Sequence, residues 1–292
     1  MKISEILNNS APCLSFEVFP PKTTTAFESV KEATERIAEL HPAFMSVTYG
    51  AGGGTSKYTI EIAKNIGERH GVPSLAHLTC VSSDKDTVLA RIADIKAAGI
   101  ENVMALRGDI PADLKDSDRS LWAYRHAIDL VYEIKQNAPH LCVGGACYPE
   151  VHPESASAKD DILHLKEKVD AGCDFLTTQM FFDNSLFYSF LDRARAAGID
   201  VPLIPGIMPI TNAAQIERAI SLSGSFVPTR LMKTVEKYGA DPIAMLEAGI
   251  EYATEQICEL YDCGVPCVHV YSMNKIEVAK RIMENVSPKL KK

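Results

Sequence analysis

Short apolar segments alternate with longer amphipathic segments along almost the whole chain. The short segments are rich in β-branched and apolar residues, as buried strands are, and the longer ones repeat apolar residues with the helical period. We predict strands at residues 13–18, 44–48, 74–79, 102–106, 141–147, 175–179, 203–206 and 268–271. We predict helices at residues 27–40, 59–69, 86–98, 121–137, 160–171, 185–197, 213–222, 243–261 and 275–284.

Eight strand–helix units predict an α/β fold, a TIM (β/α)8 barrel, because each parallel strand needs a helical crossover to reach the next. The alternative is an open doubly wound sheet. Residues 50–55 are glycine-rich, but Thr55 stands where the dinucleotide-binding motif has Gly or Ala, and no P-loop lysine follows. At 292 residues with 46% hydrophobic content, the chain suits one such barrel, so we expect a single domain over residues 1–292.

Composition narrows the class of partner. The net charge is -8 and acids and bases are mixed along the chain, which argues against a nucleic-acid or membrane partner and favours a small molecule. The sequence has no long apolar run and no signal peptide, so we expect a cytoplasmic protein. The eight cysteines are typical of reduced thiols. Cys258, Cys263 and Cys267 form a loose cluster that could suggest a metal, but they lack a C-x-x-C pair, and we predict no metal site.

Glu17 is a carboxylate within the otherwise apolar strand predicted at 13–18, just before two prolines. Between Phe16 and Phe19 it would lose hydration, which favours the protonated form and makes Glu17 a candidate general acid. The alternative is that strand alternation turns Glu17 outward to water while its neighbours face the core.

Polar residues also follow most of the other predicted strands. Catalytic groups of a parallel barrel lie at the carboxyl ends of its strands, so these residues predict a polar pocket there. The residues are Thr48, Tyr49, Gly50, His77, Thr79, Arg107, Gly108, Asp109, Tyr148, Glu150, His152, Gln179, Tyr271 and Asn274.

Several of these positions allow two interpretations. Arg107 could bind an anionic group, and Asp109 could face positive charge that develops during a reaction. Alternatively, the two side chains pair with each other and hold a loop. Asp161, His164 and Lys168 share one helix face, which either binds a phosphate-bearing cofactor or is simply solvated.

The roles of the histidines, of Gln179 and of the aromatic residues also allow more than one interpretation. His77 and His152 suit acid/base chemistry, metal binding or plain hydrogen bonding, and their spacing disfavours a metal. Gln179 is followed by aromatic residues, and its amide could recognise a flat heteroaromatic ring. Alternatively, the amide only makes hydrogen bonds to the backbone at the end of the strand. Trp122 and Tyr124 either pack in the core or form an aromatic wall.

Seven segments, in order, resemble the methylenetetrahydrofolate reductase family. They are SFEVFPPK (15–22), SVTYGA (46–51), HLTC (77–80), LRGD (106–109), YPEVHPE (148–154), KVDAG (168–172) and TQMFFD (178–183). The resemblance runs from the first strand to the last helix, and it is to the bacterial form that consists of the catalytic barrel only. It implies a TIM barrel that binds FAD.

The resemblance also implies a reaction. The family reduces 5,10-methylenetetrahydrofolate to 5-methyltetrahydrofolate with NADH or NADPH through FAD. Glu17 would protonate N10 of the folate, and Asp109 would favour the cationic intermediate. The implied substrate-binding residues are Glu17, Gln179, Gln215 and Lys275. The implied FAD contacts are Thr48, Tyr49, Ala51, His77, Arg107, Gly108, Asp109, Tyr124, Tyr148, His152, Ser155, Asp161, His164 and Lys168.

Four positions depart from the usual bacterial pattern. His164 stands in place of Asn, Glu167 in place of Arg, and Ser155 in place of Ala. Lys275 stands in place of an Arg that would face the folate glutamate tail, and it keeps the charge but not the bidentate geometry.

We expect a homo-oligomer with a folate substrate. Two other hypotheses remain open at this stage. One is a flavin-independent barrel hydrolase or lyase that uses Glu17 and Asp109, and the other is a non-catalytic barrel subunit of a larger complex.

Overall fold

The computed structural model describes residues 1–9, 11–21, 24–49, 56–110, 119 and 122–290. The strands in this part of the chain are β1 (Cys13–Val18), β2 (Met45–Val47), β3 (Ser74–Thr79), β4 (Asn102–Leu106), β5 (Cys142–Cys147), β6 (Phe175–Thr178), β7 (Leu203–Ile204), β8 (Gly206–Ile207) and β9 (Cys267–Tyr271). They form one sheet in the order β7-β6-β5-β4-β3-β2-β1-β9-β8, and every neighbouring pair is parallel.

The two ends of this order belong to one interrupted strand. Leu203–Ile204 pairs with β6, and Gly206–Ile207 pairs with β9. Pro205, which has no N–H to donate to a ladder, separates the two pieces. Its carbonyl still accepts a hydrogen bond of 2.9 Å from the His269 N–H, so the chain itself joins the two ends of the sheet. The predicted parallel α/β barrel is confirmed.

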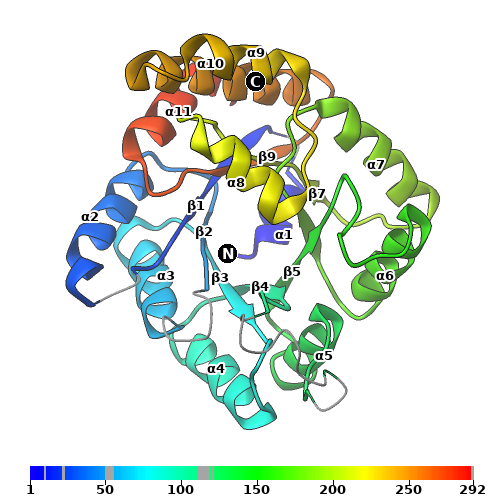
Figure 1. The fold of residues 1–292 in the computed structure, drawn as a ribbon. Coiled ribbons are helices and arrows are strands. Elements are labelled where there is room, and N and C mark those ends of the chain that lie inside the picture. Colours follow the sequence, from blue (N-terminus) through cyan, green and yellow to red (C-terminus); the bar gives the residue numbers. More distant parts are fainter. Residues whose placement is uncertain (10, 22–23, 50–55, 111–118, 120–121, 291–292) are drawn as a thin grey trace.

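The described part of the chain has eleven helices, most of which surround the strands in a ring (Figure 1). They are α1 (Ile3–Leu7), α2 (Phe27–Ala38), α3 (Ser56–His70), α4 (Lys85–Ala97), α5 (Ala127–Asn137), α6 (Ala158–Asp170), α7 (Asn184–Ala196), α8 (Ala214–Ser223), α9 (Thr229–Tyr238), α10 (Pro242–Asp262) and α11 (Ile276–Leu290), with a short 3-10 turn at Thr24–Ala26. Asp84, Ser157, Asp183 and Asp241 cap the first turns of α4, α6, α7 and α10 by accepting backbone N–H groups.

Three helical features differ from the sequence-based prediction. The helix predicted from residue 121 begins at Ala127, because the Asp129 carboxylate binds the N–H groups of Arg125 and His126 and so fixes the first turn there. The helices α1 and α9 were not predicted. At five residues, α1 is too short to show a helical period.

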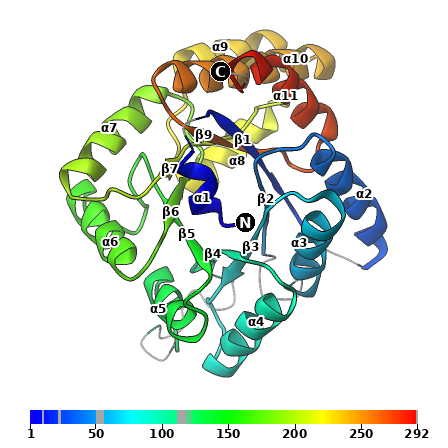
Figure 2. The ribbon, with the colours of Figure 1, turned by 180° about the vertical axis from the view of Figure 1, so that it is seen from behind.

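The interior of the barrel has an apolar end and a polar end. Helix α1 covers the end of the barrel that faces the viewer in Figure 2, whereas α8 crosses the opposite end in Figure 1. Ile3 and Leu7 of α1 pack with Phe44 and Phe175 in a buried cluster. The Asn102 side chain holds α1 there by accepting the Ile3 N–H at 2.8 Å. The end crossed by α8 is therefore the one left for a polar site.

Candidate active site

The Glu17 side chain points into the barrel. Ser46 Oγ, on β2, donates a hydrogen bond of 3.3 Å to Glu17 Oε2. The Nε2 atoms of His77 on β3 and His269 on β9 lie 3.6 Å and 3.8 Å from the same oxygen. Phe16 and Val18, the neighbours of Glu17 along β1, belong to the hydrophobic cluster shared with the surrounding helices, so strand alternation turns Glu17 to the interior of the barrel. Only 10% of the Glu17 side chain is exposed. The alternative of an outward-facing Glu17 is therefore wrong.

Ser15 extends this polar cluster through His269, and neither of these two residues was predicted to lie in the site. His269 Nδ1 lies 2.7 Å from Ser15 Oγ, and His269 Nε2 lies 3.0 Å from Ser46 Oγ. The sequence does contain a signal for them. Ser15 and Glu17 are two residues apart on β1, as are His269 and Tyr271 on β9, so each pair shares the interior face of its strand.

His77 is a buried imidazole with an unused nitrogen. Burial lowers the pKa of His77, and the nearby Glu17 carboxylate opposes this only in part. The ring is therefore neutral at neutral pH. His77 Nε2 has no hydrogen-bond partner among the described residues. A buried polar atom without a partner costs free energy, and here it lies beside Glu17, where a ligand would meet it.

Arg107 pairs with Glu154 rather than with Asp109. Its two terminal nitrogens donate to the two Glu154 carboxylate oxygens at 2.6 Å and 3.1 Å, and Arg119 lies 3.5 Å from the same carboxylate. The Arg107 hydrogen bond lowers the pKa of Glu154. Asp109 is exposed. The predicted Arg107–Asp109 loop pair is thus replaced by a bidentate bridge to the next strand's loop.

Position 108 requires glycine because of its backbone conformation and because neighbouring side chains pack closely against it. Its φ angle is 89°, a region that L side chains rarely adopt. A Cβ atom there would lie 2.9 Å from Val81 Cγ1 and 3.0 Å from Thr79 Cβ. Glycine at this position therefore lets the loop after β4 lie against the end of β3.

The loop after β5 gathers several predicted cofactor contacts. The rings of Tyr148 and His152 meet edge to face at 4.6 Å. Ser155 Oγ donates to Asp161 Oδ1 at 2.8 Å, and Lys168 Nζ donates to a β5 backbone carbonyl. Burial lowers the pKa of His152, with Arg107 and Lys168 lowering it further and Glu154 and Asp161 raising it, so all these charges are close to the ring.

Other predicted contacts lie elsewhere or outside the described residues. Tyr124 is buried in the helical layer, where its hydroxyl donates to Glu133 Oε2 at 3.2 Å. His164 is exposed on α6. Tyr49 packs against the outer hydrophobic core, and the Thr48 N–H donates to β1 at 3.0 Å. Gly50 and Ala51 lie outside the described residues. The cofactor roles of these residues stay predictions.

The predicted substrate residues form two groups. Gln179 Oε1 accepts the N–H of Met180 at 2.9 Å, which fixes the orientation of the amide at the end of β6. Gln215 Oε1 accepts the Thr211 N–H at 2.7 Å, and Lys275 Nζ donates to Thr211 Oγ1 at 2.7 Å. Thr211 therefore connects Gln215 and Lys275 at the start of α8, and the substrate roles of Gln179, Gln215 and Lys275 stay predictions.

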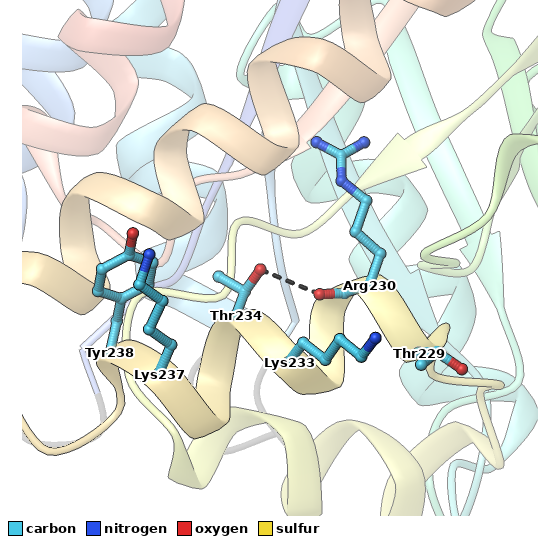
Figure 3. Close-up of a pocket in the computed structure, with 6 residues that line it drawn as sticks. All are labelled: Thr229, Arg230, Lys233, Thr234, Lys237 and Tyr238. Carbon is cyan, nitrogen blue, oxygen red and sulfur yellow. Dashed lines mark hydrogen bonds between the residues drawn. The ribbon is translucent and has the colours of Figure 1, made fainter.

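A separate pocket of about 620 Å³ lies on α9 (Figure 3). Its lining residues are Thr229, Arg230, Lys233, Thr234, Lys237 and Tyr238. Two of its cations are already engaged, because Arg230 pairs with Glu255 and the Lys237 ammonium lies 4.7 Å from the Tyr238 ring centre. One helix supplies the whole lining, so this pocket shares no element with the Glu17 cluster.

The described residues contain no group of three or more His, Cys, Asp or Glu side chains placed to hold a metal ion. None of the helices in the described part of the chain has the length and apolar character that a membrane span needs.

The fold and the site together define a parallel α/β-barrel protein with a buried carboxyl group, that of Glu17, at the polar end of the barrel. The sequence places this chain in the methylenetetrahydrofolate reductase family, which it matches over residues 2–287. It is similar to 5,10-methylenetetrahydrofolate reductase from Pectobacterium carotovorum subsp. carotovorum, with 35% identity over 92% of this chain and 88% of that one. The Escherichia coli enzyme shows the same identity and coverage.

A plant relative and a solved structure extend the comparison. Methylenetetrahydrofolate reductase (NADH) 1 of Arabidopsis thaliana is 32% identical over 98% of this chain, which spans only half of that protein's length. A solved Clostridium thermocellum protein, described as uncharacterized and as binding two copies of 5-methyl-5,6,7,8-tetrahydrofolic acid, has a TM-score of 0.69 over 99% of both chains. At 17% sequence identity, that likeness concerns the fold alone.

Proposed function

We propose that this member of the methylenetetrahydrofolate reductase family reduces 5,10-methylenetetrahydrofolate to 5-methyltetrahydrofolate with NADH or NADPH, and that it uses FAD. Family membership supports the reaction. The observation that carries the residue assignment is the buried carboxyl group of Glu17, which points into the polar end of the barrel between Ser46, His77 and His269. Family membership also favours this function over the hydrolase, lyase and non-catalytic alternatives.

The residues present fit FAD. Arg107 and Lys168 are two cations close to His152, whose ring meets that of Tyr148. Both are already engaged, Arg107 with Glu154 and Lys168 with a β5 carbonyl, so a pyrophosphate group would share or displace these contacts. The unpartnered Nε2 of His77 lies on the same side of the barrel beside Glu17 and needs a polar partner. We assign these side chains, together with the Gly108 loop, to holding the cofactor. When bound, FAD supplies hydride transfer between the nicotinamide and the folate.

Glu17 is the acid in this proposal. Its proton goes to N10 of the folate as the bond between N10 and the methylene carbon breaks, and N10 keeps the electron pair of that bond. The shielded position of Glu17 keeps bulk water from competing for this proton. Ser46 orients the carboxylate by its hydrogen bond of 3.3 Å, so the acid faces one direction in the barrel.

Gln179, Gln215 and Lys275 are assigned to the folate. The oriented amide of Gln179 presents its nitrogen to a heteroaromatic ring, because its oxygen is already held by the Met180 N–H. Lys275 provides a positive charge for a glutamate carboxylate at the start of α8. Asp109, exposed on the loop after β4, would favour positive charge that develops on the substrate.

Spectroscopy under anaerobic conditions tests this proposal. Protein reconstituted with FAD should be yellow and should bleach on addition of NADH or NADPH. Addition of 5,10-methylenetetrahydrofolate should then restore the colour and yield 5-methyltetrahydrofolate. Failure to take up FAD, or bleaching without subsequent folate turnover, would contradict the proposal.

A further inference from the structure

The Tyr271 hydroxyl connects two strands that are not neighbours in the sheet. Tyr271 is the last residue of β9, and its hydroxyl donates a hydrogen bond of 2.6 Å to the backbone carbonyl of Thr178, the last residue of β6. Among the described strands, β6 pairs with β5 and β7, whereas β9 pairs with β1 and β8. The phenol therefore reaches across the interrupted strand, at the place where the ladder of the barrel is weakest.

Gly206 on β8 leaves room for this contact. A Cβ atom at Gly206 would collide with the Tyr271 hydroxyl oxygen and would lie 2.5 Å from the Thr178 carbonyl oxygen. The Gly206 N–H also donates to Thr178 Oγ1 at 2.9 Å, so β8 itself is held to the end of β6. Glycine at this position thus lets the phenol pass over β8 and bind β6.

The two ends of this connection lie beside two residues assigned to the substrate. Tyr271 is directly opposite Glu17 in the register of β9 and β1. Thr178 immediately precedes Gln179, whose N–H donates to the Cys147 carbonyl at 2.7 Å. Burial raises the pKa of Tyr271 well above its ordinary value, and the nearby Glu17 raises it further, so the hydroxyl keeps the proton that it donates.

The loop after Gln179 is held independently of Tyr271. The backbone carbonyls of the next three residues each accept a hydrogen bond from a side chain in the C-terminal third of the chain. The donors are Ser225 to Met180 at 3.3 Å, Gln256 to Phe181 at 3.1 Å and Tyr252 to Phe182 at 2.7 Å. Loss of the Tyr271 hydroxyl therefore frees the backbone just before Gln179 while the rest of the loop stays anchored.

We propose that Tyr271 is a positioning residue that fixes Gln179 relative to Glu17, so that a folate ring bound by the amide presents N10 to the acid. The inference rests on the proposed function and on the roles assigned there to Glu17 and Gln179. The Tyr271 hydroxyl has one proton, which it gives to the Thr178 carbonyl. Tyr271 thus acts through Gln179 and does not donate to the substrate.

Two matched substitutions test the proposal. Tyr271→Phe removes only the hydroxyl, and Tyr261→Phe removes the same kind of bond elsewhere, because the Tyr261 hydroxyl donates at 2.8 Å to the carbonyl of Cys13 near the apolar end. We expect Tyr271→Phe to lower kcat/KM for 5,10-methylenetetrahydrofolate about 10-fold, since a misplaced group costs up to about 100-fold. Tyr261→Phe should stay within about twofold of wild type.

The division of this loss between KM and kcat separates positioning from a structural role. Displacement of Gln179 weakens its contact with the folate and so raises KM, whereas a smaller folded fraction lowers the maximal rate and leaves KM unchanged. We therefore expect most of the Tyr271→Phe loss in KM. An unchanged KM, or an equal rise of KM in Tyr261→Phe, would overturn the proposal.

A double variant tests whether Tyr271 acts through Gln179. In a Gln179→Ala background the amide is absent, so Tyr271→Phe should lower kcat/KM by less than about twofold more. If the two losses multiply instead, the hydroxyl acts on the folate or on FAD directly, and the positioning role is wrong. Circular dichroism of each variant checks that it is folded.

Amide hydrogen exchange tests the connection without turnover. The N–H groups of Gln179 and Gly206 should exchange at least about fivefold faster in Tyr271→Phe than in wild type, and at the wild-type rate in Tyr261→Phe. If wild type reduces no methylenetetrahydrofolate but this exchange becomes faster, the proposed function fails and the positioning of Gln179 stands. If wild type is active and neither the exchange nor KM changes in Tyr271→Phe, the positioning role fails alone.

Discussion

At the residue scale, the carboxyl group of Glu17 can be tested apart from the cofactor. Glu17→Gln keeps the shape of the side chain but removes its acidic proton. We expect the folate half-reaction to slow at least about 100-fold, as loss of a general acid implies, while anaerobic bleaching by NADH or NADPH stays within about threefold of wild type. Stopped-flow absorbance of the flavin measures both steps.

A second buried carboxylate supplies the control for this experiment. Glu133 is 9% exposed and lies on α5, in the helical layer rather than in the barrel. Glu133→Gln should leave both half-reactions near wild type. Equal slowing of the two half-reactions in Glu17→Gln would point to a structural role for Glu17 and contradict its assignment as the acid.

His77 gives a prediction about stability and pH. Its pKa is lowered in the folded protein by burial, whereas the unfolded chain has an ordinary histidine. Below about pH 6.5 the unfolded state therefore binds a proton that the folded state does not, and stability falls as the pH falls, by up to about 1.4 kcal/mol per pH unit.

Thermal unfolding between about pH 5 and pH 8 measures this effect across the histidine range. His77→Gln should flatten the decline in Tm on the acid side relative to wild type, because the variant has no imidazole to protonate. An identical slope for the two proteins would show that His77 does not contribute to it.

The sequence could identify individual site residues but not their contacts. Glu17 stood out as a charge in an apolar strand, yet its direction was ambiguous because the residues on both faces of β1 are buried. Its partner His269 is more than 250 residues away in the chain, in a strand that only the closed barrel places beside β1. The same limit applies to Arg107, whose partner Glu154 lies on the loop after the next strand.

At the element scale, Gly144 on β5 and Phe175 on β6 depend on each other. A Cβ atom at Gly144 would lie 2.5 Å from Phe175 Cζ, inside any real contact distance, and the Phe175 ring is fully buried. Gly144→Ala should therefore destabilise the protein by about 1–3 kcal/mol through overpacking. Urea unfolding followed by circular dichroism measures the change.

Gly67 on α3 is the matched control for this substitution. Nothing lies within 4 Å of a Cβ atom placed there, and the residue is in the interior of a helix. Gly67→Ala should stabilise the protein by about 0.5–1 kcal/mol, because alanine loses less backbone entropy in a helix. A neutral or stabilising Gly144→Ala would mean that the ring of Phe175 moves aside at little cost.

Most elements could be predicted because their signals are local. The strands predicted at 74–79 and 102–106 match β3 and β4 exactly in their bounds, since each is an apolar run closed by polar or glycine-containing loops. The interruption of the strand at Pro205 was harder to predict from the sequence. A proline removes one ladder hydrogen bond, but only the neighbouring strands determine that β7 pairs with β6 and β8 with β9.

At the scale of the whole molecule, the barrel separates a stabilising end from a reactive end. The predicted barrel followed from counting strand–helix units, but the cover formed by α1 could not be predicted, because it depends on the fit of Ile3 and Leu7 to an interior that exists only after folding. Substitutions near α1 should therefore change stability, and substitutions near α8 should change activity.

Asn102 tests this separation. It is 2% exposed, and its side chain binds the N–H of Ile3 at 2.8 Å and the carbonyl oxygen of Ser74 at 3.1 Å. Asn102→Ala leaves these buried groups without partners, so we expect a loss of about 1–3 kcal/mol in stability and faster amide hydrogen exchange in residues 1–9. Both half-reactions should keep their wild-type rates at temperatures where the variant is folded. A slowed folate half-reaction in the folded variant would show instead that the packing of α1 is transmitted through the barrel to Glu17, and that the two ends do not act independently.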